Sequence, residues 1–270
     1  QLYDYQIPEK LSEFIQVGVR VQLPFGGRET EGVIVERVGI PERAGELKNI
    51  TRVLSDVPVA TTQSLLLIDT IAAHFGANAW DVIRSAIPAR VASVDKNFAI
   101  RSLHIENKAK FSVEFQTLAP YIEAHDQLVN LVLSNSGSGS VLVIAPDEKD
   151  VDRIIQSLDM NGVKALKLTA AIPREERYRN YLQAMHGGNS VVVGTRSAIF
   201  APVNNLNTII VHKESSLDHY EIRSPGWNSR SVALIRSKSE SVKLILTGFS
   251  PSIEVSQLIE EREVKYVNSK

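Results

Sequence analysis

VVVGTRSAIFAPVNNLNTIIV, residues 191–211, holds two apolar runs on either side of a polar loop. Val191–Val193 stops at Gly194, and Ile209–Val211 follows the loop. Fully apolar runs are typical of strands buried on both faces of a parallel sheet, so we expect two neighbouring strands. Ligands bind such sheets at the carboxyl ends of the strands. The segments GTRSA and HKES, which follow the two runs, therefore form either a ligand site or ordinary strand-end loops.

Apolar runs and helical spacing alternate from residue 120 onward, which predicts an α/β lobe with a parallel sheet covered on both faces. The flexible composition of SNSGSGS, Ser134–Ser140, predicts a loop inside this region. The strands are predicted at residues 141–145, 165–168, 191–193, 208–211 and 242–246, and the helices at residues 120–133, 147–158, 173–186, 230–238 and 253–260.

Residues 1 to about 57 have a different, β-rich pattern. Arg20–Phe25 and Glu31–Val38 alternate polar and apolar residues, and Gly26-Gly27 supplies a turn between them. The spacing then predicts a helix over Val59–Phe75 and a short one over Trp80–Ser85. The fold class expected is therefore a small β-rich α+β N-terminal domain followed by one α/β lobe.

Composition limits the classes of function. The 270 residues carry a formal net charge of −1, with 43% apolar and 23% charged residues, so any nucleic-acid site must be local. There is no cysteine, which excludes disulfides and Cys-based zinc sites. No apolar run reaches the ~18 residues of a membrane span. We expect a cytoplasmic protein without a membrane partner, and the start at Gln1 indicates processing or a fragment.

Several segments resemble the PriA replication-restart helicase family, also called primosomal protein N′. The matching segments of the lobe are VVVGTRSAIFAP, NLNTIIV, WNSRSVALIR (227–236) and TGFSPSIEV (247–255). Those of the N-terminal region are YDYQIP (3–8), GVRVQLPFGGR (18–28), GELKNITRVL (45–54) and AWDVIRSAIPAR (79–90). The resemblance implies a 3′-end DNA-binding domain at residues 1–93, a linker or reduced winged-helix remnant at 94–119, and a RecA-like helicase lobe at 120–270. The family's second lobe, with its zinc-binding cysteines, has no counterpart here.

The resemblance also implies a pocket for the terminal nucleotide of a DNA 3′ end. By position, Tyr3, Asp4, Gly26 and Lys48 match its lining. Tyrosine can stack on a base, aspartate can accept from a base edge or a sugar hydroxyl, and lysine can meet a phosphate. Glycine lets the backbone approach closely. Without the resemblance, the aspartate and lysine would be interpreted as solvated residues of a β domain.

The phosphate cradle of a helicase motor is missing from the sequence. No segment matches G-x-x-x-x-G-K-[ST], whose backbone N–H groups and lysine surround the phosphates. Where the family places its cradle, this chain has EFQTLA, Glu114–Ala119, without glycine or lysine. The alternative SGSGS, Ser136–Ser140, also lacks the lysine and precedes a strand.

The acidic box is altered as well. The family shows Asp-Glu-Glu-His after its apolar strand, whereas this chain has His212, Lys213, Glu214 and serine. Histidine is a poor ligand for Mg²⁺, and a protonated lysine cannot act as the base. Thr247–Pro251, TGFSP, replaces the family's Gly-Ser-Ala-Thr-Pro. We therefore expect a catalytically inactive lobe with no cofactor, although the family uses ATP, Mg²⁺ and zinc.

Three functions follow from these observations. The first is a DNA-binding replication-restart protein that recognises forks or 3′ ends, with other restart or single-strand-binding proteins as partners. The second is a fragment of an ATP-dependent DNA helicase with an unconventional nucleotide site. The third is a metabolic enzyme with an acid/base or metal site made from His212, Glu214, Asp218 and His219.

Three further polar positions belong to the degenerate motor motifs. They are Thr195, Arg196 and Arg230. These residues are either remnants of the helicase site or surface ligands for a partner protein.

Overall fold

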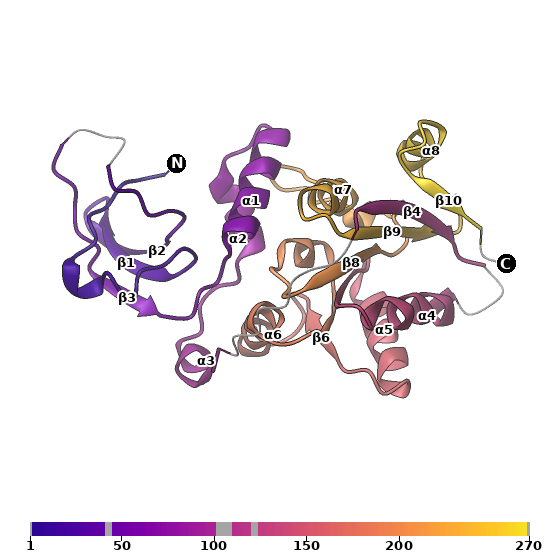
Figure 1. The fold of residues 1–270 in the computed structure, drawn as a ribbon, viewed down its shortest axis with the longest axis horizontal. Helices are drawn as coiled ribbons and strands as arrows, with labels where there is room; N and C mark the ends of the chain where they lie inside the picture. The colour runs from indigo at the N-terminus through magenta and orange to yellow at the C-terminus, as the bar shows by residue number, and fades with distance from the viewer. Residues whose placement is uncertain (1, 41–44, 101–109, 120–123, 269–270) are drawn as a thin grey trace.

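The computed structural model describes residues 2–40, 45–100, 110–119 and 124–268. Within these ranges the chain forms a three-stranded antiparallel sheet and a seven-stranded parallel sheet (Figure 1). The small sheet contains β1 (Arg20–Phe25), β2 (Arg28–Val33) and β3 (Arg52–Ser55). The large sheet contains β4 (Ser112–Thr117), β5 (Ser140–Ile144), β6 (Ala165–Leu168), β7 (Val191–Gly194), β8 (Leu206–Val211), β9 (Lys243–Gly248) and β10 (Lys265–Val267).

Helices surround and follow these strands. The α-helices are α1 (Thr62–His74), α2 (Ala79–Ala86), α3 (Ala92–Asn97), α4 (Ala124–Ser136), α5 (Glu148–Met160), α6 (Arg174–His186), α7 (Ser229–Ser239) and α8 (Ile253–Glu260). Short 3₁₀ helices are η1 (Glu9–Leu11), η2 (Arg196–Phe200) and η3 (Leu217–His219). The predicted fold class, a small β-rich unit followed by a parallel-sheet lobe, is confirmed.

The small sheet, in the order β2-β1-β3, is built on a tight hairpin. Gly26 and Gly27 both have positive φ, 56° and 78°, as a two-residue turn with the twist of a hairpin requires. The turn pairs Phe25 with Arg28, so β2 begins there and ends at Val33. The strand predicted at Glu31–Val38 was therefore misplaced, because the turn sets the register even though the first four residues of β2 are exposed.

The large sheet has the order β10-β4-β9-β8-β5-β7-β6, and every neighbouring pair is parallel. β7 and β8 lie in one sheet as expected, but they are not neighbours, because β5 lies between them. An apolar run shows that a strand is buried on both faces and does not fix its place in the order. After β7 the chain passes through η2 and a loop before it enters β8. In that loop, Asn205 O accepts from Ser140 N at the start of β5 (2.8 Å).

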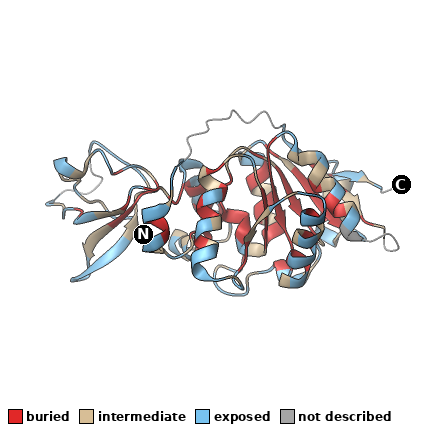
Figure 2. Cartoon of the chain, turned by 90° about the horizontal axis from the view of Figure 1, so that it is seen from below, coloured by how far each residue is buried: buried red, intermediate tan, exposed pale blue. Residues whose placement is uncertain are grey.

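Alternate residues of the central strands face two separate cores. Val191 and Val193 pack with α4 and α5, whereas Val192 packs on the opposite face with α1, α2, α6 and α7. In Figure 2 the buried residues concentrate along the strands of this sheet, between the helices. Burial on both faces accounts for the continuous apolar runs of the sequence.

Helices α1 to α3 pack on the lobe. Leu65, Ile68 and Ile71 of α1 and Val82 of α2 belong to the same apolar cluster as the strands and α6. The small sheet has its own core, made of Ile15, Val19, Val21 and Ile50. The purple helices of Figure 1 accordingly lie between the small sheet and the large one.

The region 94–119, expected to be a linker or winged-helix remnant, contributes to the lobe. Ser112–Thr117 forms β4, which pairs with β9 and β10 inside the large sheet. The start of the helix predicted at residue 120 lies outside the described residues, and α4 runs from Ala124 to Ser136. The loop expected at Ser134–Ser140 is shorter, because α4 extends into it and β5 begins at Ser140.

Candidate functional site

Three segments far apart in the sequence meet at one end of the small sheet. Gln6 N donates to Lys48 O (2.9 Å), and Ile50 N donates to Gln6 O (3.0 Å), so the N-terminal segment runs beside residues 48–50. Tyr5 Oη donates to Pro24 O (3.1 Å), next to the hairpin turn. The structure thus brings together the segments that carry all four residues predicted for the 3′-end pocket.

Two aromatic rings lie at this end of the sheet. The ring centroids of Tyr3 and Phe25 are 4.9 Å apart in an edge-to-face arrangement, and the side chains are 45% and 44% exposed. Exposed aromatic faces are suited to stacking on bases. The sequence did not predict Phe25 as a site residue, although its position immediately before the glycine turn was a usable signal.

The other predicted residues lie on the same chain segments. Asp4 is half-buried between Tyr3 and Tyr5, and Lys48 is exposed. A Cβ at Gly26 would meet open space, so glycine is needed there for its positive φ and not because a neighbouring chain approaches closely. The carboxylate, the lysine and the two rings give this end of the sheet the chemistry to hold a nucleotide.

The segments compared with the motor motifs meet at the carboxyl edge of the large sheet. Thr117 of β4 is in register with Gly248 of β9, and Leu118 N donates to Gly248 O (2.9 Å). Glu214 N donates to Thr247 O (2.9 Å), which joins the altered acidic box to the altered third motif. The edge is therefore assembled, and its chemistry depends on the side chains found there.

His212 and Lys213 point to different elements. A hydrogen bond of 3.2 Å joins His212 Nδ1 to Thr247 Oγ1, and the histidine is fully buried. Lys213 has φ of 51°, in the left-handed region that non-glycine residues rarely adopt. Its Nζ donates to both carboxylate oxygens of Asp150 on α5, at 2.8 and 2.6 Å. Asp150 is only 2% exposed, so the lysine neutralises a buried carboxylate.

Glu214 is the centre of a buried ion pair. Its Oε2 accepts from Arg230 Nη1 (2.8 Å) and from Ser252 Oγ (2.9 Å), and its Oε1 accepts from Ser252 N (2.6 Å). Arg230 also contacts Glu254 at 3.1 Å. Burial lowers the pKa of Arg230, but hydrogen bonding and the charge of Glu214, helped by Glu254, raise it overall. Glu214 therefore fastens the first turns of α7 and α8 to the sheet edge.

The residues of the proposed acid/base or metal site have internal partners. His219 Nδ1 lies 2.9 Å from Ser229 Oγ, and its Nε2 lies 2.9 Å from His212 O. Burial lowers the pKa of His219, so its neutral form is favoured. Asp218 is exposed on η3. In the ranges that the structure covers, no group of three His, Cys, Asp or Glu residues is arranged to hold a metal ion.

Thr195 and Arg196 lie at the end of β7, apart from the Glu214 cluster. Thr195 O accepts from Ala198 N (2.8 Å) at the start of η2. Arg196 Nε lies 3.3 Å from Glu221 Oε2, and its Nη1 lies 3.3 Å from Asp218 O. Arg196 thus ties η2 to the loop around η3, and Arg230 belongs to a different network.

Comparisons with known proteins agree with the geometry of the small sheet. Residues 1–88 match a family model described as the PriA 3′ DNA-binding domain. A protein named probable replication restart protein PriA, from Mycobacterium tuberculosis, is 30% identical over 95% of this chain and 43% of its own length. The protein of that name from Mycobacterium leprae is 28% identical over 95% of this chain and 44% of its own length.

Two solved structures resemble the chain at low sequence identity. The C-terminal domain of Dbp5 from S. cerevisiae, bound to Gle1 and IP6, matches 58% of this chain and 90% of that chain, with 14% identity and a TM-score of 0.45. RecG bound to a three-way DNA junction matches 77% of this chain and 29% of that chain, with 16% identity and a TM-score of 0.42. Over the described part of the chain, no helix has the length and apolar character to span a bilayer.

The chain spans less than half the length of the curated relatives that it matches, and it is similar to them over nearly all of its own length. The family model accounts for the small sheet together with α1 and α2, where the aromatic pair and the predicted pocket lie. Over nearly all of its length the chain is therefore similar to proteins named replication restart protein PriA, and its residues 1–88 carry a domain of the PriA 3′ DNA-binding type.

Proposed function

We propose that this chain binds DNA at forks or 3′ ends through the end of its small sheet, and that it does so without ATP-driven unwinding. The observation that supports the first part is the Tyr3–Phe25 ring contact in a region matched to a 3′ DNA-binding model, with the chain segments of Asp4 and Lys48 joined by backbone hydrogen bonds. Because the net charge is −1, recognition rests on stacking and a few hydrogen bonds more than on bulk charge. Other replication-restart or single-strand-binding proteins are the partners that this role implies.

The specific prediction concerns Asp4. Asp4→Ala should reduce the preference for an oligonucleotide with a free 3′-hydroxyl over one with a 3′-phosphate by about tenfold, because a lost hydrogen bond to a charged group costs roughly 1.5 kcal/mol. Fluorescence anisotropy with the two oligonucleotides measures this ratio. Asp69→Ala, at an exposed aspartate of α1, is the matched control and should keep the wild-type ratio.

Lys48 separates end recognition from general affinity. Lys48→Ala should weaken both oligonucleotides alike and lower the salt slope by about one, as expected for one phosphate contact. Lys96→Ala, at an exposed lysine of α3, should leave both quantities unchanged. Equal wild-type affinity for free and blocked ends would contradict the proposed pocket.

The side chains at the carboxyl edge support the second part of the proposal. The carboxylate of Asp150 is paired with Lys213, and that of Glu214 is paired with Arg230. Neither of these two carboxylates is therefore poised to hold Mg²⁺ or to position a water. The residue at the position of the first acidic ligand is His212, a poor Mg²⁺ ligand. These residues do not fit a Mg²⁺–nucleotide complex.

ATP turnover by the purified protein should therefore stay at background, with or without single-stranded DNA. The measurement is phosphate release at saturating ATP and Mg²⁺, with equilibrium binding of a fluorescent nucleotide beside it. DNA-stimulated turnover that co-purifies with the chain through successive columns would favour the alternative, a helicase fragment with an unconventional nucleotide site.

A further inference from the structure

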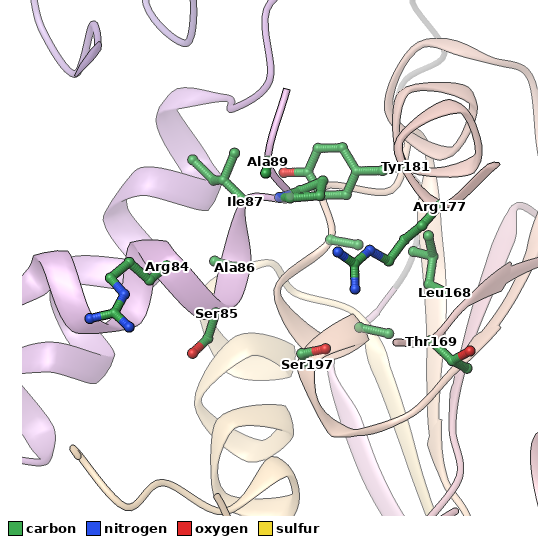
Figure 3. Close-up of a pocket in the computed structure, with 13 residues that line it drawn as sticks. Arg84, Ser85, Ala86, Ile87, Ala89, Leu168, Thr169, Arg177, Tyr181 and Ser197 are labelled. Atoms are coloured by element: carbon green, nitrogen blue, oxygen red, sulfur yellow. The ribbon is translucent and has the colours of Figure 1, made fainter. Parts of the chain in front are cut away.

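A cavity of about 240 Å³ lies between the N-terminal helices and the lobe, well apart from the small sheet's aromatic pair. Its walls come from the end of α2 and the loop after it, from the end of β6, from α6 and from η2 (Figure 3). The carboxyl ends of parallel strands are where α/β sheets bind ligands, and β6 ends at this cavity with Leu168 and Thr169.

The charge of the lining is one-sided. Arg84 and Arg177 contribute to it, the hydroxyl groups come from Ser85, Thr169, Tyr181 and Ser197, and no aspartate or glutamate lines it. The Tyr181 hydroxyl already donates to Val59 O (2.8 Å). Figure 3 shows the Arg177 guanidinium directed into the space between α2 and β6, toward Ser197. The Arg84 side chain extends away from this space in Figure 3. A cavity with the Arg177 guanidinium directed into it and no carboxylate in its lining favours an anionic occupant.

Arg177 differs from Arg90 and Arg236, two other arginines near this junction. Arg90 Nε donates to Asp95 Oδ2 (2.6 Å), and Arg236 Nη1 donates to Ile199 O (2.5 Å). By contrast, the Nε of Arg177 is buried and finds no acceptor among the residues that the structure describes. A buried donor without an acceptor costs roughly 1–3 kcal/mol, so a ligand or water that accepts from it is expected.

The donor geometry selects the class of anion. A guanidinium presents N–H groups in a planar fork that matches the oxygens of a phosphate, and hydroxyl groups can add further donors. The hydroxyl of Thr169 already donates to Glu148 (3.1 Å), which leaves Ser85 and Ser197 as the hydroxyl donors of the lining. We propose that this cavity binds a phosphate-type oxyanion, supplied either by a nucleic-acid backbone or by free phosphate.

The position of the cavity gives its occupant a structural consequence. The loop that lines it also anchors the small sheet, because Pro88 O accepts from Arg20 of β1 and Arg90 Nη2 donates to Leu54 O (2.6 Å). An anion held by Arg177 on α6 and by the end of α2 therefore braces the junction between the DNA-binding unit and the lobe. This site does not depend on the proposed 3′-end pocket.

Thermal unfolding with sodium phosphate, at constant ionic strength against sodium chloride, tests the proposal. The wild type should show a saturable rise in Tm, and Arg177→Met should abolish it. Arg179→Met is the matched control, because Arg179 is an exposed arginine of the same helix and should leave the rise intact. Ala89→Glu adds a carboxylate at an exposed position of the lining and should also abolish the rise, should Arg177→Met fail to fold.

The source of the phosphate is separated with a single-stranded oligonucleotide blocked by a 3′-phosphate, which bypasses recognition of a free 3′-hydroxyl. A backbone phosphate predicts that Arg177→Met lowers affinity severalfold and the salt slope by about one, and that sodium phosphate competes with the oligonucleotide. Free phosphate as the source predicts loss of the Tm rise with unchanged DNA affinity. The proposal would be overturned if Arg177→Met, Ala89→Glu and Arg179→Met all showed the same Tm change with phosphate and the same oligonucleotide affinity as the wild type.

Discussion

Replacement of Glu214 by alanine is expected to lower the free energy of unfolding by about 3 kcal/mol, because it leaves the buried Arg230 without its buried partner and with only the exposed Glu254 as counter-charge. Glu214 is 1% exposed and Arg230 is 5% exposed, so water cannot replace the lost carboxylate. The same change removes an acceptor from Ser252 N, at the first turn of α8. Three contacts that join the sheet edge to α7 and α8 are lost together.

Urea unfolding followed by circular dichroism measures this effect. The matched control is Glu175→Ala, which removes an exposed ion pair with Arg179 on α6. Exposed pairs contribute about 0–1 kcal/mol, so the control should unfold close to the wild type. Glu214→Gln should lie between the two, because the amide oxygen can still accept one hydrogen bond while Arg230 keeps only the exposed Glu254 as counter-charge.

The outcome bears on function as well as on stability. If Glu214 still positioned an attacking water, its replacement would reduce nucleotide turnover while leaving stability nearly intact. A stability loss of less than 1 kcal/mol together with a loss of ATP turnover would therefore contradict the structural role assigned to Glu214. The expected result is the opposite: a large loss of stability in a protein that shows no turnover to lose.

The sequence predicted those elements whose pattern reflects local burial. The continuous apolar run Val191–Val193 reflects a strand that is buried on both faces, and the spacing of Ile253–Glu260 reflects a helix that is buried on one face. Long-range pairing is not encoded in such patterns. Lys213 and Asp150 are 63 positions apart in the sequence. Only the fold shows that the lysine of the altered acidic box forms an ion pair with this buried aspartate. The insertion of β5 between β7 and β8 was hidden for the same reason.

Some residues of the candidate DNA site were predicted from the sequence, and others were not. The resemblance supplied Tyr3, Asp4, Gly26 and Lys48, and hydrogen bonds of Tyr5 and Gln6 join the segments that carry them. Phe25 and the cavity residue Arg177 were not predicted. A single aromatic residue at a turn and a single arginine on a helix carry no distinguishing pattern, because their roles arise from neighbours distant in the sequence.

The packing of α1 to α3 against the lobe leads to the second large effect. A fragment of residues 110–270, which keeps the large sheet and lacks these helices, is expected not to fold cooperatively. Val59, Leu65, Ile68, Ile71 and Val82 are nearly inaccessible to solvent and share one apolar cluster with the sheet. Each such side chain contributes roughly 1.5–3 kcal/mol by burial, so their joint loss approaches the typical total stability of about 5–15 kcal/mol.

Polar contacts add to this dependence. Tyr178 Oη donates to Asp95 Oδ1 (2.7 Å), and Tyr181 Oη donates to Val59 O (2.8 Å), both in buried positions. Without residues 58–98, these two hydroxyl groups of α6 lose their acceptors in the middle of an exposed apolar face. In the intact chain, burial raises the pKa of both tyrosines well above the usual value, and for Tyr178 the neighbouring Asp95 raises it further, so both hydroxyl groups stay protonated and act as donors.

The control fragment is residues 57–270, which keeps α1 to α3 and omits the small sheet. That sheet has its own core and adds only the partly buried Val17, Val33 and Val35 to the lobe's cluster. Fragment 57–270 should therefore unfold in a single transition, whereas fragment 110–270 should show none. Equal cooperative transitions in both fragments would place the boundary near residue 94, as the sequence resemblance implied. The expected result instead places it near residue 57, with the small sheet joined to the lobe by a short connection beside Arg20 and Arg90.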